Sequence, residues 1–259
     1  MSGQIIKRLK PEDEELLRKR DELAAVRAAL AELELELVDL RGQLAAFEGR
    51  YLRQVGSLYA ELDEWKARLS ELRARLDPSP ASRAEAEEAR EQARQTYEDA
   101  HGEASETPDF TPSPDLKKLF RDVAKLIHPD FSKDAADLAR RTRLMAEANR
   151  AYAIGNAEAL QRILDEYHDG ADAVEGEGIG AELIRIIRQI SLAKSHVAAI
   201  RQEVDTLRQS EIALLKKQAE ESWQEGRDLL AELAATIQEQ IELAKQENQY
   251  LAEQEVKPA

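Results

Sequence analysis

The chain has no cysteine, few aromatic residues and no long uncharged apolar segment, and each absence narrows the class of protein. Without cysteine there are no disulfides and no thiol chemistry. The lack of an apolar run removes the signal of a membrane-spanning helix, and Met1-Ser2-Gly3 does not begin a charged and then apolar leader. We therefore expect a cytoplasmic protein with no membrane partner.

Glycine and proline are also scarce, with 11 and 8 among 259 residues, and they gather in short stretches. Charged residues make up 34% of the chain, and its formal net charge is -15. This composition, dominated by Glu, Ala, Leu, Arg and Gln, is typical of long helices and coiled coils. Because phosphate contacts need clustered cations, the acidic balance argues against a nucleic-acid partner.

No set of residues typical of a catalytic site is recognisable. The sequence has no phosphate-cradling glycine loop, no G-x-S-x-G elbow and no His/Cys spacing of a metal site. Its four histidines are scattered through different segments, and His196 is interpreted as a residue flanking a helical stripe rather than as a ligand. Carboxylate pairs are numerous, but charged helix faces carry them as a rule. We expect no enzymatic activity, no cofactor and no metal.

A heptad pattern covers residues 12–77. Its apolar residues alternate between spacings of three and four, except for two consecutive fours at Phe47, Tyr51 and Val55. The pattern predicts a coiled-coil helix with one stutter, where the supercoil relaxes near Tyr51 and Gly49. At 1.5 Å per residue this helix would be roughly 95 Å long.

A second heptad pattern covers residues 181–255. It begins at Leu183, weakens after Leu207 and resumes at Leu230. Gly226 and the polar residues before it predict a kink or a loosened segment there.

The two patterns predict an all-α fold in which long antiparallel coiled-coil helices flank a small helical module. Each apolar stripe would bury the other in a hairpin, with the module near its far end. The alternative is a parallel homodimer, because heptads do not reveal whether their partner lies in the same chain. Two segments are expected to let the module reorient: an acidic helix and linker at 78–108, and an acidic, glycine-rich linker at 169–180.

The central segment contains His128-Pro129-Asp130 at the end of a basic helical pattern, and a second helical pattern follows it. Pro129 is expected to end the first helix near His128, because a residue before proline is pushed out of the α region. Taken alone, a basic helix face is also typical of a solvated surface, and His-Pro-Asp of a simple turn. The basic strip consists of Lys117, Lys118, Arg121 and Lys125, which lie off the apolar face.

This helix, His-Pro-Asp loop and following helix, at residues 109–168, resemble the J domain of DnaJ-type co-chaperones. Lys117, Phe120 and Arg121 stand where the family has basic, aromatic and basic residues on the exposed side of its second helix. The run from Asn149 to Tyr152 resembles the N-x-A-Y of its third helix. The chain is identified as a divergent, bacterial-type member with flanking coiled coils.

The chain departs from the J-domain pattern in three places. The aromatic-x-x-leucine-glycine motif of the first helix is absent, Asp122 replaces a basic residue, and the loop before the third helix is longer. Phe110 or the acidic helix pattern from Ala84 to Tyr97 is expected to fill the place of the missing helix. Phe110, Met145, Ala148 and Tyr152 are interpreted as core residues.

The resemblance implies that the basic helix docks on a DnaK-type chaperone and that the loop promotes ATP hydrolysis by that partner. The coiled-coil arms would serve targeting or assembly, through an unknown protein or a second copy of the chain. The alternative is a structural adaptor whose J-like module docks without ATPase stimulation, which Asp122 and the missing motif favour. The implied chaperone-binding residues are His128, Pro129, Asp130, Lys117, Lys118, Phe120, Arg121 and Lys125.

Overall fold

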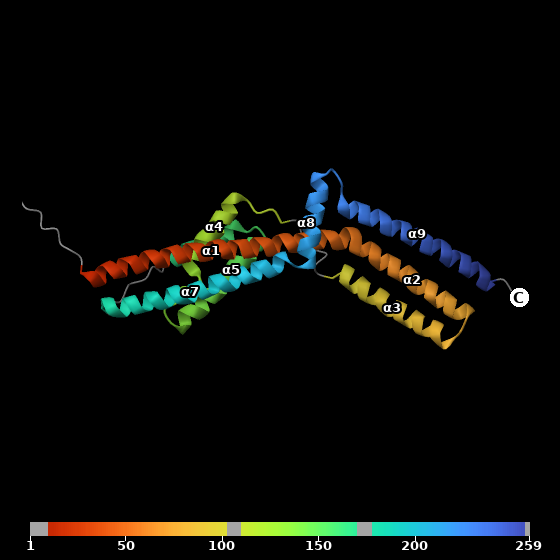
Figure 1. Cartoon of the computed structure of the whole chain (residues 1–259), viewed down its shortest axis with the longest axis horizontal. Coiled ribbons are helices and arrows are strands. Elements are labelled where there is room, and N and C mark those ends of the chain that lie inside the picture. The colour runs from red at the N-terminus through yellow and green to blue at the C-terminus, as the bar shows by residue number, and fades with distance from the viewer. Residues whose placement is uncertain (1–9, 103–109, 170–177, 257–259) are drawn as a thin grey trace, which may run out of the picture. The chain divides into compact units, whose positions relative to one another are not determined.

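The computed structural model describes residues 10–102, 110–169 and 178–256, and all regular structure in these residues is helical. This confirms the expected all-α fold (Figure 1). The elements are α1 (Pro11–Tyr51), the π-helical turn η1 (Leu52–Gly56), α2 (Ser57–Leu76), α3 (Pro80–Ala100), α4 (Pro114–Ile127), the 3-10 turn η3 (Pro129–Phe131), α5 (Ala135–Ala153), α6 (Ala157–Asp169), α7 (Ile179–Arg208), α8 (Glu211–Gln224) and α9 (Leu229–Val256).

The chain forms two compact units, each assembled from segments that are distant in the sequence. Among the described residues, unit 1 comprises 10–42, 110–169 and 178–208, and unit 2 comprises 43–102 and 209–256. This division cuts across the consecutive domains expected from the sequence, because N-terminal helices pair with C-terminal ones. The linker expected after α6 lies almost wholly outside the described residues.

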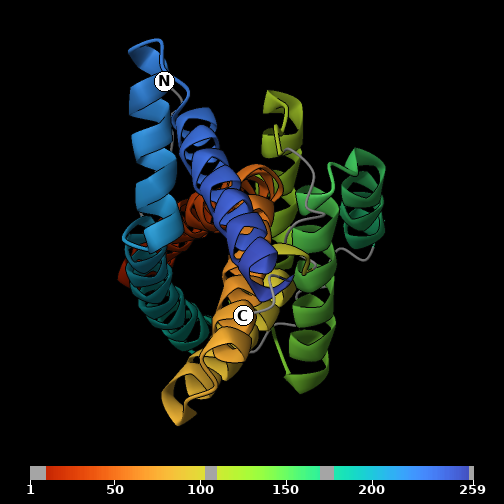
Figure 2. The ribbon, with the colours of Figure 1, turned by 90° about the vertical axis from the view of Figure 1, so that its right-hand side faces the viewer.

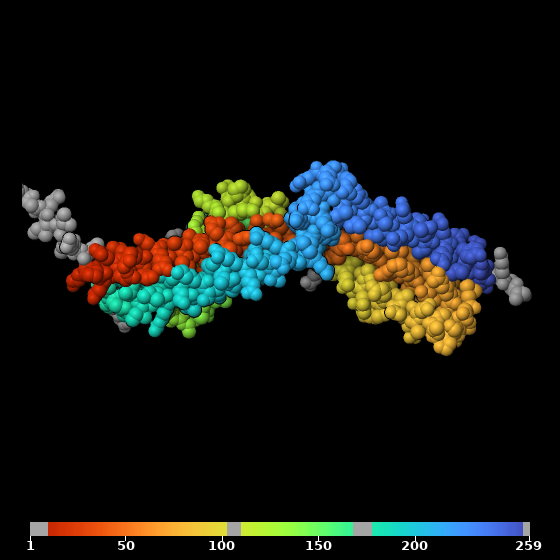
Figure 3. Space-filling view, viewed as in Figure 1, coloured from red at the N-terminus to blue at the C-terminus, as the bar shows by residue number. Residues whose placement is uncertain are grey.

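In unit 1, α1 and α7 lie side by side and bury their apolar stripes against each other, as expected (Figures 1 and 3). The direction of the pair differs from the expectation, because the two helices run parallel. Arg20 pairs with Glu182 and Arg41 with Glu203, and both pairs are 162 residues apart. In an antiparallel pair the sum of the residue numbers would stay constant instead. The buried stripes are Leu16, Leu23, Leu30 and Leu37 of α1 and Ile186, Ile190, Ala193, Ile200 and Val204 of α7.

Unit 2 repeats this parallel arrangement with α2 and α9, which lie beside each other in Figure 2. Arg73 pairs with Glu247, and Arg75 Nε lies 2.8 Å from Glu255 Oε1, so both helices advance in the same direction. The buried apolar residues of the pair include Leu62 and Leu69 of α2 and Leu230, Ile237 and Ile241 of α9.

The parallel direction follows from α3, which was expected as an acidic helix but without a packing partner on α2. Ser79 caps its N-terminus, where the Ser82 N–H donates to Ser79 Oγ over 3.1 Å. The helix then runs back along α2, since Arg90 pairs with Glu71 and Thr96 Oγ1 donates to Asp63 Oδ2 over 2.9 Å. The chain thus reverses direction within unit 2, through α3, before the central module begins. The C-terminal helices can therefore run in the same direction as the N-terminal ones.

The central segment forms a helical module, the central module, of α4, η3, α5 and α6, and it does not lie near the far end of a hairpin as expected. Within unit 1 it packs against the middle of α1. Ala31 and Leu35 of α1 belong to the same buried cluster as Phe120, Ala148 and Tyr152 of the module. The core assignments of Met145, Ala148 and Tyr152 are confirmed, and Phe110 packs against this cluster, partly buried.

The stutter in the N-terminal pattern coincides with the π-helical turn η1. A π turn spans one residue more than an α turn, so it absorbs the extra residue that two consecutive four-residue spacings create. Val55 consequently stays fully buried, and Phe47 and Leu62 belong to the same apolar cluster. The expected local relaxation near Tyr51 therefore takes the form of a widened turn.

The weakening of the C-terminal pattern corresponds to two real breaks. The first lies at Ser210, which caps α8, and the second follows Gln224, where Gly226 takes a positive φ of 78° that suits glycine. The predicted break at Gly226 is thus confirmed. Among the residues that the structure describes, no helix has the length and apolarity needed to cross a membrane.

Candidate functional site

The His-Pro-Asp loop closes the hairpin formed by α4 and α5. Ser113 caps the start of α4, accepting from the Leu116 N–H over 3.1 Å, and the helix ends at Ile127. His128 has φ -56° and ψ 132°, the extended backbone that a following proline favours. The predicted helix end before Pro129 is therefore confirmed. The hairpin is antiparallel, since Arg141 of α5 meets Leu126 near the loop.

His128 is buried and points into unit 1 rather than toward solvent, with 3% of its surface exposed. Its Nε2 lies 3.3 Å from Glu34 Oε1 of α1, and its Nδ1 accepts from the Asp130 N–H over 3.2 Å. A carboxylate only accepts, so Nε2 carries the proton and Nδ1 keeps its lone pair. Glu34 thereby sets the tautomer and the orientation of the ring.

Asp130 faces α7, where it meets a histidine that the sequence pattern did not single out as functional. His196 Nδ1 lies 2.8 Å from Asp130 Oδ1. The other carboxylate oxygen, Oδ2, is buried and has no hydrogen-bond partner. Only 9% of the Asp130 side chain is exposed. The two polar ends of the loop are thus turned onto α1 and α7.

Arg141 of α5 holds the loop from inside the hairpin, although nothing in its sequence pattern marks it. It is buried, and its Nη1 donates to the backbone oxygens of Leu126 and His128 over 2.9 and 3.3 Å. Its Nε donates to Asp137 Oδ2 over 2.8 Å. The guanidinium therefore satisfies the Leu126 carbonyl, which the end of α4 leaves without a helical partner, and adds a second donor to the His128 oxygen, which also accepts from the Phe131 N–H.

Asp137 ties this network to the start of α5. Burial acts to raise the pKa of its carboxyl, but hydrogen bonds from Arg141, Arg140 and the Lys133 N–H outweigh burial and hold the pKa below its ordinary value. Arg27 of α1 lies over the ring of Phe131 at 4.3 Å, and burial followed by the charge of Arg141 lowers its pKa. The loop thus rests on a largely buried set of charges.

Half of the basic strip on α4 is paired with carboxylates of α1. Lys117 Nζ donates to Asp39 Oδ2 over 2.9 Å, and Arg121 Nη1 donates to Glu32 Oε2 over 3.2 Å. Lys118 is exposed, and Lys125 Nζ lies 4.0 Å from Asp122 Oδ1 within its own helix. Two of the four predicted docking cations therefore already have acidic partners on α1.

Phe120 does not lie on the exposed side of α4, and the interpretation of it as an exposed aromatic is wrong. Its side chain is fully buried, and its ring lies 4.9 Å from that of Tyr152. It shares the face of Leu116, Val123 and Ile127, at heptad spacing. Phe120 is accordingly a core residue of the central module.

The place expected for a first helix is taken by α1 together with Phe110, and not by α3, which packs on α2. The Phe110 ring meets Tyr152 edge-on, with centroids 5.7 Å apart, and lies directly over Gly42 of α1. The Tyr152 hydroxyl donates to Asp39 Oδ1 over 3.0 Å. Burial and the charge of Asp39 raise the pKa of Tyr152.

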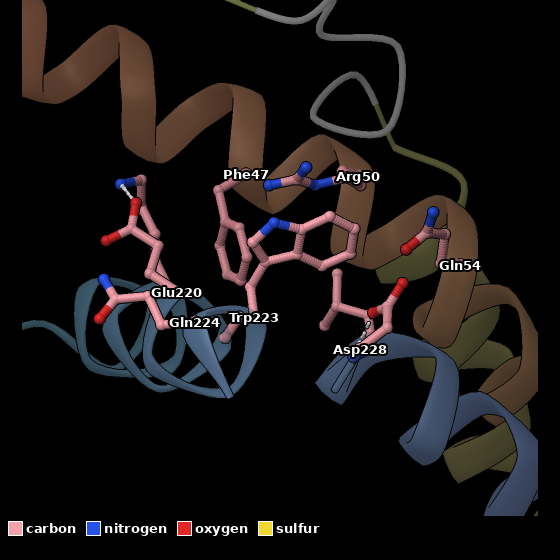
Figure 4. Close-up of a pocket in the computed structure, with 10 residues that line it drawn as sticks. Phe47, Arg50, Gln54, Glu220, Trp223, Gln224 and Asp228 are labelled. Atoms are coloured by element: carbon pink, nitrogen blue, oxygen red, sulfur yellow. Dashed lines mark hydrogen bonds and ion pairs between the residues drawn. The ribbon is translucent and has the colours of Figure 1, made fainter. Parts of the chain in front are cut away.

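A pocket of about 560 Å³ lies in unit 2, away from every residue predicted as functional. Figure 4 shows the Trp223 ring pointing from α8 toward Phe47 and Arg50 of α1, with Gln54 of the π turn beyond it. Trp223 is 71% exposed, the largest such aromatic surface among the described residues. The residues lining the pocket include no serine, cysteine or histidine.

The chain was compared with protein-family models, with curated proteins and with solved structures, and none of the three comparisons finds a match.

Proposed function

We propose that the chain is a J-domain-type co-chaperone that recruits a DnaK-type chaperone and stimulates its ATPase. The observation that carries the proposal is the antiparallel hairpin of α4 and α5, whose short His-Pro-Asp loop is fixed by Arg141 beneath it. A simple turn has no need of a buried arginine that bonds to two backbone oxygens where the loop begins. The helix pairs of α1 with α7 and of α2 with α9 would serve targeting or assembly.

In the described arrangement, α1 and α7 cover the surfaces that such a partner would use. His128 pairs with Glu34 and Asp130 with His196, and Lys117 and Arg121 of the basic strip pair with Asp39 and Glu32. An acidic surface of the chaperone would compete with these carboxylates for the same cations. The proposal therefore includes an opening step in which α1 and α7 withdraw from the module. The proposed function also places the chain in the cytoplasm, where ATP is available to the DnaK-type partner.

Single-turnover ATP hydrolysis tests the proposal. The DnaK-type chaperone of the same organism would be assayed alone, with the chain and with its His128→Gln variant. We expect the chain to stimulate hydrolysis and the variant not to. The variant must keep the helicity and melting temperature of the parent, and an established J protein serves as positive control. Equal hydrolysis with and without the chain would contradict the proposal.

A matched pair of variants tests whether α1 restrains the module. Glu32→Gln removes the partner of Arg121, whereas Glu15→Gln makes the same charge change at a residue that pairs with Arg18 on its own helix. Loss of a surface pair worth up to about 1 kcal/mol shifts an opening equilibrium by about two- to fivefold. We expect Glu32→Gln to raise stimulation by that factor and Glu15→Gln to leave it unchanged.

The second candidate function is a structural adaptor whose module docks a partner without stimulating ATP hydrolysis. The specific observation in its favour is that His128 and Asp130 are both buried against other helices of the same unit. Stimulation by neither the parent chain nor Glu32→Gln would favour this alternative. The search for a partner would then begin at the exposed Trp223 pocket of unit 2.

A further inference from the structure

Two histidines and an aspartate from separate elements meet at one point of unit 1. Ligand atoms of His128, Asp130 and His196 all lie within 4.8 Å of one another. His196 Nδ1 is 2.8 Å from Asp130 Oδ1, and His128 Nδ1 is 3.8 Å from Asp130 Oδ2. Ligand atoms around a tetrahedral zinc ion are about 3.3 Å apart, so the three donors are within about 1.5 Å of that spacing.

The carboxylate at the centre of this group is incompletely satisfied. Asp130 Oδ2 is buried and accepts no hydrogen bond, although buried carboxylate oxygens are as a rule paired. It lies 3.8 Å from the Nδ1 of His128, which carries a lone pair and no proton. Two electron-pair donors that face each other without a proton between them are the arrangement that a cation stabilises.

Glu34 supplies the outer contact that metal-binding histidines typically have. A ligating imidazole usually donates its other ring N–H to a carboxylate or carbonyl, which fixes the tautomer and raises the basicity of the ligating nitrogen. His128 Nε2 lies 3.3 Å from Glu34 Oε1, which leaves Nδ1 free to ligate. The Asp130 N–H now donates to that Nδ1 over 3.2 Å, a long contact that a metal bond would replace.

Access to the group is open from one side. A pocket of about 590 Å³ lies between the loop and α7, and Pro129 and Asp130 form part of its wall. His196 has 55% of its side chain exposed, so its ring can adjust to a bound ion. Arg185 and Arg188 line the same pocket and would favour an anion or a hydroxide as a further ligand.

We propose that His128, Asp130 and His196 bind one divalent transition-metal ion. Two imidazoles and one carboxylate are ligands that suit zinc, with a water or anion in the fourth position. The ion joins the His-Pro-Asp loop to α7 and so holds the module in the covered arrangement. This last consequence rests on the proposed co-chaperone function, whereas the metal site itself does not.

Calorimetric titration of the full chain with zinc, after treatment with a chelator, tests the site. We expect saturation at one equivalent per chain. His196→Ala removes an exposed ligand and should weaken binding at least tenfold while leaving helicity unchanged. The matched control is His101→Ala, since His101 is also exposed and lies in unit 2 beside Tyr97. Absence of saturable binding, or equal binding by His196→Ala, would overturn the proposal.

Two further variants distinguish a direct metal ligand, Asp130, from Glu34, which only contacts the ligand His128. Asp130→Asn should abolish the binding of one equivalent, because an amide oxygen is a weaker ligand than a carboxylate. Glu34→Gln keeps all three ligands and should weaken binding about 10- to 100-fold. Cobalt is the second probe, because its visible absorption reports the coordination geometry. A tetrahedral spectrum in the parent chain that disappears in His196→Ala is the expected result. An identical spectrum in both would show that the ion binds elsewhere.

The regulatory consequence is measured separately. If the chain stimulates a DnaK-type ATPase, one equivalent of zinc should reduce that stimulation in the parent chain and in His101→Ala, but not in His196→Ala. Because the titrations contain no chaperone, failure of the proposed function leaves them intact. Zinc binding without any ATPase stimulation would support the proposed metal site and contradict the proposed co-chaperone function.

Discussion

At the scale of single residues, the loop conformation depends most on Arg141. Its guanidinium reaches the backbone oxygens on both sides of the α4 terminus and the carboxylate of Asp137. Removing this buried charge costs more than removing any one of its hydrogen bonds, because the Leu126 oxygen, the His128 oxygen and the Asp137 carboxylate all lose a donor at once. The same reasoning does not apply to Arg140, whose side chain is 47% exposed.

Arg141→Met should therefore lower the free energy of unfolding by about 3 kcal/mol, since methionine keeps the aliphatic stem but none of the donors. Arg140→Met, one residue away and also paired with Asp137, should change it by no more than about 0.5 kcal/mol. Urea denaturation followed by helix content measures both. Similar losses in the two variants would mean that the loop does not depend on the buried guanidinium.

The lowered pKa of Asp137 means that its contribution to the free energy of unfolding should be lost in acid. Its pKa is lower in the folded chain than in the unfolded chain, so its contribution is fully present above the unfolded value. The contribution decreases as the pH falls through the folded pKa, because the folded state must then take up a proton. We expect the stability difference between the parent chain and Asp137→Asn to be largest near pH 6 and to shrink below about pH 4. A difference that is constant over this range would contradict the assignment.

Predictions for single residues were correct where the local backbone determines the structure. They were wrong or missing where packing between helices determines which side chains are buried or brought together. Pro129 ends α4 for a reason that is visible in the sequence. Phe120 was assigned to the exposed face by resemblance, although its spacing from Leu116 and Val123 placed it on the apolar face. The positions of Arg141 and His196 beside the loop carry no sequence signal, because their partners come from other turns and other helices.

At the scale of elements, the π turn η1 keeps the apolar stripes of α1 and α2 on one side. It contains one residue more than an α turn would, so deleting a residue there converts it to a regular helix without rotating its flanks. Deletion of a residue within a regular helix instead rotates everything beyond it by about 100°. The two kinds of deletion therefore have opposite consequences for the buried stripe.

Deletion of Arg53, an exposed residue of η1, should cost about 1 kcal/mol or less. Deletion of Glu64, which is exposed within α2, should cost more than about 4 kcal/mol, because Leu69 and Leu72 leave the buried face. Thermal melting of the two variants distinguishes them. Equal losses would show that the π turn does not carry the register change.

The contact between α1 and the module is tightest at Gly42. A methyl group there would lie 2.7 Å from the Phe110 ring, which is too close without a shift. Overpacking costs about 1–3 kcal/mol, and the better helix propensity of alanine returns about 1 kcal/mol. We expect Gly42→Ala to destabilise the chain by about 1 kcal/mol.

The same substitution should change sign when the ring is absent. In a Phe110→Ala background only the propensity gain remains, so Gly42→Ala should stabilise by about 1 kcal/mol. The double-mutant cycle is measured by chemical denaturation. Additive effects would indicate that Phe110 does not rest on Gly42.

Helix positions were largely predictable, and helix directions were not. The helix starts at Ser79 and Ser113 follow from a capping serine before a proline, and the break at Gly226 from glycine among polar residues. A heptad stripe, in contrast, presents the same apolar face to a parallel and to an antiparallel partner. The direction was decided by α3, an expected acidic helix whose small apolar content gave no sign that it packs on α2.

At the scale of the whole molecule, the parallel pairing makes a prediction about cross-links. A zero-length reagent that joins lysines to carboxylates should connect Lys194 with Glu22, whose Nζ and Oε1 lie 2.6 Å apart. It should likewise connect Lys245 with Glu61, at 3.1 Å. The first pair lies within unit 1 and the second within unit 2, and each pair belongs to a single chain.

Mixing isotope-labelled and unlabelled chains before the reaction identifies where the partner comes from. Cross-linked peptides should be wholly labelled or wholly unlabelled, because each stripe is buried by its own chain. Mixed peptides would indicate that a dimer uses the same faces. Links that join Glu22 to the residues of α9 would restore the antiparallel hairpin.

The parallel arrangement also sets an order of events during synthesis. Asp130 is translated 78 residues before Arg208, the last residue of α7. At 5–20 residues per second, the His-Pro-Asp loop leaves the ribosome roughly 4–16 s before its cover is complete. A nascent chain would therefore pass through a period in which the loop has α1 beside it and no α7. Any activity of the loop that α7 suppresses is available first to the ribosome-bound chain.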